Sequence, residues 1–88
     1  MVRLIAERLT PLEAQRLVGF IVLWSHAAQT TEGWRDMQLS DQVRVYAEQW
    51  RSHERTVWRS LALVRRTLPE LGPDSTPEQA AEHFLAAA

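Results

Sequence analysis

The chain has no cysteine and no lysine, and both absences narrow what it can be. Without cysteine it can form no disulfide and no thiolate metal site. All ten basic residues are arginine, a bias that a GC-rich genome produces by codon usage alone. Arginine is also the side chain whose planar guanidinium fits phosphate and guanine, so the bias is compatible with polyanion binding without requiring it.

Long hydrophobic runs and strand-like alternation are missing as well. The most apolar stretch, residues 17–24, has eight residues, whereas a membrane span needs roughly 20. Residues 2–8 carry two arginines, but Thr10, Pro11 and Glu13 interrupt the apolar run that a signal peptide would need. We therefore expect a cytoplasmic protein with no membrane partner. With no alternating segment of useful length, we expect an all-α fold.

The length of 88 residues predicts one small domain covering residues 1–88. Its apolar fraction of 45% is that of a globular protein, and its net charge is −1. The charge is unevenly distributed. Residues 35–66 contain seven arginines and four acids, whereas residues 67–88 contain four acids and no base. A basic middle with an acidic tail is the asymmetry expected when one face meets a polyanion.

Start and stop signals predict a small helical bundle, with three helices forming its core and a C-terminal helix added. The expected helices cover residues 2–9 and 11–28 (the N-terminal supporting part, 1–34), 41–50, 54–67 and the C-terminal segment 76–88. Thr10 and Thr76 each precede a proline and are followed three residues later by Glu13 or Gln79, the pattern of a capping box.

Other positions carry more local expectations. Ser40 is expected to cap the helix of 41–50, and residues 29–38 to form a loop that returns Trp34 to the core. Trp24 and Trp50 are also expected in the core. Gly19, inside the first long helix, costs about 1 kcal/mol relative to alanine unless close helix packing needs the space.

Residues 41–67 carry the most specific pattern in the chain. Ala47, Thr56, Val57, Arg59 and Leu61 match the spacing A-x3-G-x-S-x2-T-V-x-R-x-L. This segment resembles the helix-turn-helix family of bacterial and phage transcription regulators, including the DNA-binding domains of lac-type repressors, transposases and resolvases. The resemblance implies two helices joined by a tight turn, the second of which enters the DNA major groove.

The resemblance also implies a set of DNA-contacting residues. Base-reading positions on the second helix are His53, Glu54, Arg55, Trp58 and Arg59. Backbone-contacting positions are Arg44, Arg51, Thr56, Arg65 and Arg66. Arg35 is a weaker phosphate candidate on the preceding loop.

The turn departs from the family pattern at three neighbouring positions. Arg51 replaces the turn glycine, Ser52 an apolar residue and His53 the capping serine. Because a non-glycine residue at positive φ is strained, we expect either a longer turn or a cap formed by Ser52.

Signals for catalysis are absent from the sequence. His26, His53 and His83 do not share a helical face, so we expect no metal site. No nucleophile–histidine–acid set, paired catalytic carboxylates or phosphate-binding glycine loop is visible. We expect no enzyme activity, no cofactor and no small-molecule ligand.

The resulting hypothesis is a sequence-specific regulator that binds double-stranded DNA, from an actinobacterial phage or mobile element, and acts by occupying an operator. It should work as a homodimer, with Phe84 and Leu85 or Phe20 and Trp24 in the contact. The alternative is a protein-interaction module: an antitoxin, an anti-sigma-type adaptor or a phage protein that binds a host factor. A recombination directionality or replication accessory role would use the same DNA-binding face.

Overall fold

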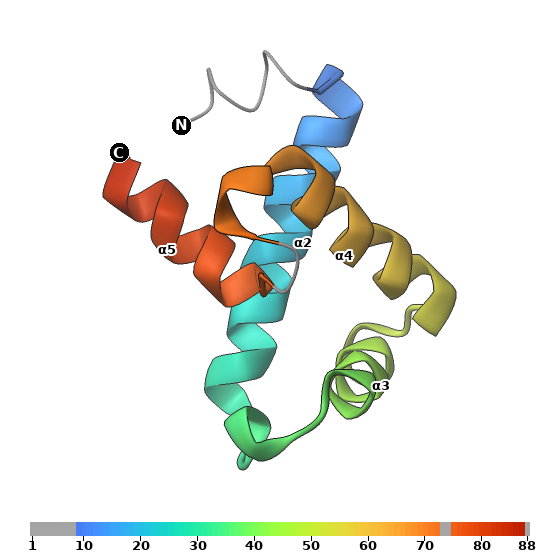
Figure 1. Cartoon of the computed structure of the whole chain (residues 1–88). Coiled ribbons are helices and arrows are strands. Elements are labelled where there is room, and N and C mark those ends of the chain that lie inside the picture. Colours follow the sequence, from blue (N-terminus) through green and yellow to red (C-terminus); the bar gives the residue numbers. More distant parts are fainter. Residues whose placement is uncertain (1–8, 73–74, 88) are drawn as a thin grey trace.

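The computed structural model describes residues 9–72 and 75–87, and within them every regular element is a helix (Figure 1). The α-helices are α2 (Pro11–Thr30), α3 (Leu39–Trp50), α4 (Glu54–Thr67) and α5 (Pro77–Ala87), and two 3-10 helices are η1 (Trp34–Asp36) and η2 (Pro69–Leu71). The all-α prediction is confirmed. The helix expected over residues 2–9 lies, apart from Leu9, outside the described residues.

Helix α2 is the central element of the bundle (Figure 1). Thr10 Oγ1 accepts a hydrogen bond from the Glu13 amide at 3.2 Å, and Glu13 Oε1 accepts one from the Thr10 amide at 3.2 Å. This capping box, with Pro11 in the first turn, starts the helix where the sequence predicts. The buried face of α2 then contacts the other three helices through the residues Leu17, Phe20, Ile21, Trp24 and Ala27.

The other helices surround α2 on its buried side. Helix α5 packs along it, and α3 and α4 contact it and each other. In Figure 1, α3 is seen nearly end-on while α4 runs across the view, so the two helices cross steeply. The two-helix layout expected for residues 41–67 is therefore present, with α2 as the third helix of the core.

A group of aromatic rings closes the core between α2, η1 and α3. The Trp24 ring centroid lies 5.1 Å from that of Trp34 and 5.5 Å from that of Tyr46. Both indole N–H groups donate to the same atom, Oε1 of Glu78 in the first turn of α5; the bond from Trp34 is 3.1 Å long. Burying two indoles requires an acceptor for each N–H, and one carboxylate from α5 supplies it.

Two local predictions are wrong. Ser40 does not cap α3: it lies exposed inside the helix, which begins one residue earlier, at Leu39. Leu39 packs against the core, and this contact favours a helix that already includes it. Gln38 is the N-cap residue and makes no side-chain hydrogen bond there. Trp50 is not a core residue, because α3 ends as it reaches the surface. Its side chain is 36% exposed and its ring lies 5.7 Å from that of His26.

Two further expectations concern residues on α2. Phe20 and Trp24 were expected at a dimer contact, but both are buried in the core of one chain and cannot supply one. Gly19 lies on the exposed side of α2, and a Cβ added there would meet nothing within 4 Å. Packing inside the chain therefore gives no reason for this glycine. The side chains of Phe84 and Leu85 lie outside the described residues.

Candidate nucleic-acid interface

The turn between α3 and α4 comprises residues 51–53, the length that the helix-turn-helix pattern predicts. Arg51 adopts the left-handed conformation at φ 50° and ψ 48°, and the Ser52 amide donates to the Ala47 carbonyl at 2.9 Å. That bond closes the last turn of α3 in the way a glycine normally does. The expectation of a longer turn or a Ser52 cap is wrong, because Arg51 itself occupies the glycine conformation, at a cost of roughly 1–2 kcal/mol.

The rotation of α4 about its axis is fixed by its buried stripe. Val57, Leu61 and Val64 are almost completely buried against the core, and Ala47 of α3 lies among them. Small size at Ala47 lets the two helices approach closely. Since the stripe occupies one side of α4, the residues on the opposite side must face solvent.

The outer face of α4 comprises the exposed residues Arg55, Trp58, Arg59, Ala62 and Arg66. Trp58 is 41% exposed, and within the described part of the chain its indole has no ring partner and no hydrogen bond. Arg55 and Arg59, one helical turn apart, have no ion-pair partner there either. The outer face therefore presents cationic groups beside an exposed aromatic ring.

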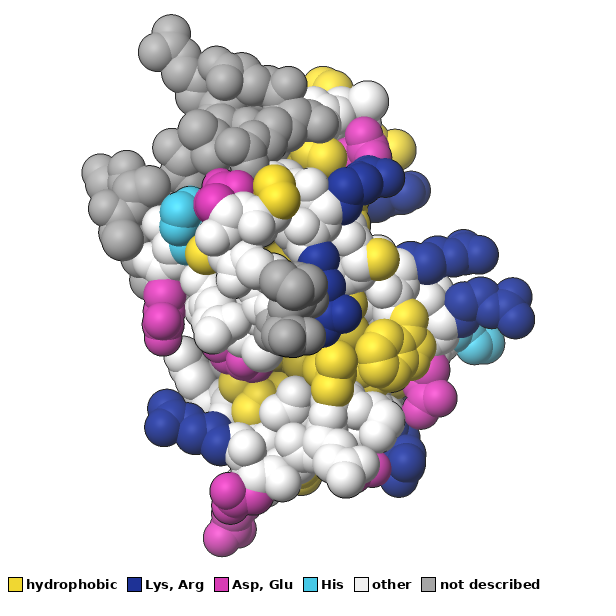
Figure 2. All heavy atoms as spheres, in the orientation of Figure 1, with side chains coloured by type: hydrophobic (Ala, Val, Ile, Leu, Met, Phe, Trp, Pro, Cys, Tyr) yellow, Lys and Arg dark blue, Asp and Glu magenta, His cyan; other side chains and the backbone are white. Residues whose placement is uncertain are grey.

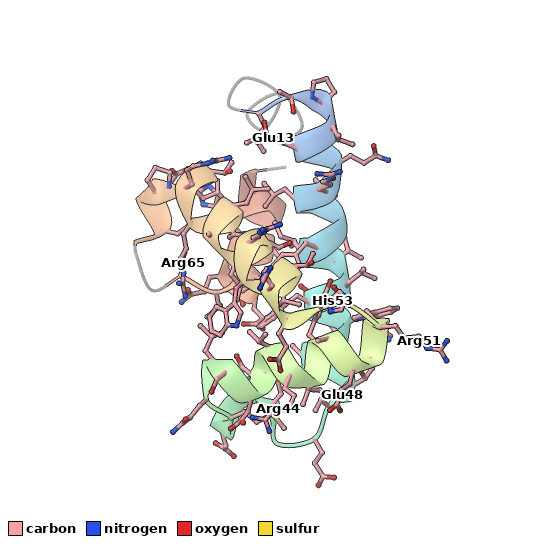
Figure 3. The ribbon with its side chains drawn as sticks, turned by 90° about the vertical axis from the view of Figure 1, so that its right-hand side faces the viewer. Glu13, Arg44, Glu48, Arg51, His53 and Arg65 are labelled. Carbon is pink, nitrogen blue, oxygen red and sulfur yellow. The ribbon has the colours of Figure 1, made fainter. Side chains whose placement is uncertain are left out.

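Helix α3 contributes to the same side of the molecule. Arg44, Glu48 and His53 lie around an open hollow between α3 and the start of α4 (Figure 3), which Glu54, Arg55 and Thr56 also line. Arg44 forms an exposed ion pair with Asp41 at 3.2 Å. An exposed pair of this kind contributes little to stability, so Arg44 can exchange Asp41 for another anion at small cost.

Arg16 is a basic residue that the sequence reasoning missed. It lies on α2, yet it lines one hollow with Arg59 and Arg66 of α4 and with Glu13. Arg66 pairs with Glu13 at 3.2 Å. The Thr10 backbone and hydroxyl hydrogen bonds, and then Arg66, lower the pKa of the Glu13 carboxyl. Only the packing of α2 beside α4 brings Arg16 here, and no spacing rule within the chain could have found it.

Arg65 and Arg35, which the sequence also suggested as phosphate contacts, do not lie with the other arginines. The Arg65 Nε donates to the Ser75 carbonyl at 3.4 Å, so this half-buried side chain also holds the segment that leads into α5. Arg35 of η1 lines a separate hollow with residues of α2 and α5, among them Gln29, Glu78 and Gln79. Arg35 therefore lies apart from the arginines of α4, and a substitution of it can serve as a control for substitutions of theirs.

The basic side chains gather along one side of the molecule. In Figure 2 most of the blue side chains project from the right-hand edge, over α4 and the turn that precedes it, with an apolar area beside them. Acidic groups are interspersed, including Glu48 and Glu54. We name the exposed arginines of this side the basic face: Arg16, Arg44, Arg51, Arg55, Arg59 and Arg66.

Searches among protein-family models, curated proteins and solved structures find no match for this chain. None of the described helices is long and apolar enough to cross a membrane. Among the described residues, no cluster of three or more histidine or acidic side chains could hold a metal ion. The arguments for function therefore rest on the geometry of the chain itself.

Proposed function

We propose that this chain binds double-stranded DNA with α4 in the major groove and acts as a sequence-specific transcription regulator by occupying an operator. One observation carries the proposal. The buried stripe of α4 turns Arg55, Trp58 and Arg59 outward together, on the same side as the cations of α3 and the turn. A helix about 10–12 Å across fits a major groove about 12 Å wide.

The chemistry of the outer face fits base reading. Arg55 and Arg59 can each donate two hydrogen bonds to O6 and N7 of guanine, the commonest specific contact in the major groove. Trp58 offers an apolar surface to a thymine methyl group. His53 and Glu54 are exposed at the start of α4, where in this arrangement they would donate to or accept from base edges.

The flanking groups suit the phosphate backbone. Arg44, Arg51 and Thr56 border the start of α4, while Arg16 and Arg66 border its second half. Phosphate contacts of this kind set register and affinity without sequence information. We retain Arg65 as a backbone contact of lesser weight, because its Nε is engaged by Ser75.

The direct test is selection of bound duplexes from a random pool, followed by affinity measurement over a salt series. We expect an enriched sequence and an affinity that falls steeply with salt. Arg66→Ala should weaken all duplexes alike and reduce the salt slope by about one unit. No enrichment, together with no salt-dependent binding, would reject the proposal.

The alternative function, a protein-interaction module, is favoured by one specific observation. Helix α2 exposes three large apolar side chains to solvent, Leu12, Val18 and Val22. If DNA selection fails, this surface becomes the place to look for function.

A further inference from the structure

A groove runs between α2 and α4, and most of its surface is apolar. It holds about 650 Å³ of space that water can enter, and ligand pockets in proteins hold roughly 300–1,000 Å³. Along α2 the groove extends from Arg16 to Leu23, which at about 1.5 Å per residue is about 10 Å. Its apolar walls are formed by Leu17, Phe20, Leu23, Tyr46, Val57 and Leu63.

Gly19 leaves the groove open on its α2 side. It is the ninth of the 20 residues in α2, where a glycine costs about 1 kcal/mol relative to alanine. A Cβ added at Gly19 meets nothing within 4 Å, and Gly19 itself lines the groove. A side chain at this position would therefore extend into the space that the groove provides. Packing within the chain gives no reason for the glycine, whereas an open groove does.

The Tyr46 hydroxyl is a polar group of the groove that lacks a partner. The side chain is 5% exposed, and its ring packs against those of Phe20 and Trp24. Within the described residues the hydroxyl forms no hydrogen bond, yet it is not among the polar atoms closed off from solvent. Burial raises the pKa of the Tyr46 phenol, so the hydroxyl stays protonated and can donate. A buried phenol normally has a hydrogen-bond partner, and a molecule in the groove would supply one.

The positive charge of the groove comes from Arg16 and Arg59. Both residues also line the neighbouring hollow with Glu13 and Arg66, to which α3 contributes no residue. The cations therefore lie toward the end of the groove that is away from Tyr46 of α3. The Glu13 carboxylate pairs with Arg66 at 3.2 Å, and neither Arg16 nor Arg59 has an ion-pair partner in the described part of the chain.

We propose that this groove binds a small organic carboxylate with an apolar body, whose carboxylate meets Arg16 and Arg59 and whose second polar group meets the Tyr46 hydroxyl. An apolar surface with a few polar groups that fix orientation is the usual composition of a small-molecule site. The unpaired guanidinium groups select an anion, and the length of the groove suits a body of about eight carbons, as in octanoate. The site draws its residues from α2, α3 and α4, so no spacing in the sequence indicates it.

The same site links the ligand to DNA, a consequence that rests on the proposed function. The Arg59 guanidinium cannot donate to guanine and to the ligand carboxylate at the same time. Octanoate should therefore weaken DNA binding, and DNA should weaken octanoate binding by the same factor. The chain would then be a regulator that an organic acid releases from its operator.

The first test uses the full chain without DNA and the fluorescent anion anilinonaphthalene sulfonate. We expect saturable binding of this dye, and its displacement by octanoate. Gly19→Leu should abolish binding by filling the groove, yet keep or raise the thermal midpoint, because the new side chain meets no atom of the chain at its Cβ. Gln15→Leu adds the same side chain at an exposed position of α2 outside the groove and should leave binding unchanged.

A second set of variants tests the charged contact. Arg16→Gln and Arg59→Gln should each weaken binding of the sulfonate about five- to tenfold. They should leave binding of phenylnaphthylamine unchanged, because this neutral dye has the same rings without the sulfonate. Arg35→Gln, which removes an arginine that does not line the groove, should change neither.

The hydroxyl contact is tested with a pair of ligands. We expect octanoate with a terminal hydroxyl group to displace the dye at lower concentration than octanoate itself. Tyr46→Phe should remove this preference while it keeps the ring contacts with Phe20 and Trp24. A preference that survives in Tyr46→Phe would overturn the assignment of the second polar group.

The remaining outcomes decide the inference separately from the proposed function. Wild-type chain that binds neither the dye nor octanoate overturns the inference, and so does binding that Gly19→Leu leaves intact. Equal losses for the charged and neutral dyes in Arg16→Gln and Arg59→Gln overturn the carboxylate contact. A chain that binds octanoate in the groove but selects no DNA sequence supports the inference and rejects the proposed function instead.

Discussion

The outer faces of α2 and α4 have the same spacing and opposite chemistry. At matching intervals, α2 presents the exposed residues Gln15, Val18, Gly19, Val22 and His26, and α4 presents Arg55, Trp58, Arg59, Ala62 and Arg66. Three of the five positions are arginine in α4 and none is in α2. Both faces are exposed in one chain, so burial does not explain the difference.

The comparison teaches that two exposed helix faces in one small bundle can have the same spacing and yet suit different kinds of contact. Unpaired arginines are stable in water and gain most when they meet phosphate or guanine. Exposed valines gain when apolar surface covers them. The two faces therefore differ in what they can bind, and substitutions on one need not disturb the other.

The largest effect on stability should come from neither outer face. Trp24→Ala, which empties the buried side of α2, should lower the free energy of unfolding by about 3–5 kcal/mol. It also leaves the Trp34 and Glu78 pair without its third member. Trp58→Ala should change it by no more than about 0.5 kcal/mol. Urea denaturation measures both, and equal losses would show that Trp58 is a packing residue after all.

The next largest effect should fall on DNA binding and on one face only. Arg55→Ala and Arg59→Ala should each weaken the preferred site by about 1–3 kcal/mol and relax sequence preference. Gln15→Ala, at the matching register of α2, and Arg35→Ala, an exposed arginine elsewhere, should change affinity little. Fluorescence anisotropy with preferred and scrambled duplexes measures this. Losses that are the same for both duplexes would remove the base-reading role.

A smaller effect of opposite sign is expected at the turn. Arg51→Gly relieves the left-handed strain and should raise the free energy of unfolding by about 1 kcal/mol. The same substitution removes one cation, so it should lower the salt slope of DNA binding by about one unit. Thermal denaturation and a salt series test the two halves. An unchanged salt slope would mean that Arg51 does not approach phosphate.

The smallest effect concerns the edge where α2 meets the basic face. The folded-state pKa of Glu13 lies below its ordinary value of 4.5, so its contribution to stability is present above that value and is lost as the pH falls through the lowered pKa. Glu13→Gln should remove that part of the acid dependence while its amide oxygen still accepts from the Thr10 amide. Thermal midpoints across this acid range measure it, and identical curves would contradict the assignment.

Much of the fold could be predicted because its signals are local. Capping boxes at Thr10 and Thr76 and the stripe of Val57, Leu61 and Val64 lie within one or two helical turns, where chain geometry is nearly fixed by sequence. Helix α4 has the predicted bounds, and α2 starts where Thr10 places it. The predicted cap at Ser40 was wrong because the packing of Leu39 against the core outweighs the preference of serine for the N-cap position.

The candidate site could be predicted only in its local part. Positions on α4 follow from the rotation that its buried stripe imposes, so the exposure of Trp58 was foreseeable. Arg16 and Glu78 were not, because each meets its neighbours across more than 40 residues of chain. The exposure of Trp50 could not be predicted either, because it depends on how α3 packs against α2 and not on the local sequence.

The carboxylate of Glu78 also has a consequence for the order of synthesis. All six arginines of the basic face are translated before α5, but the acceptor for the Trp24 and Trp34 indoles comes only with residue 78. A nascent chain that has emerged through α4 therefore carries the whole basic face on a core in which the two indole N–H groups still lack their acceptor. A chain truncated after α4 should therefore be cleaved by protease faster than the chain that includes α5.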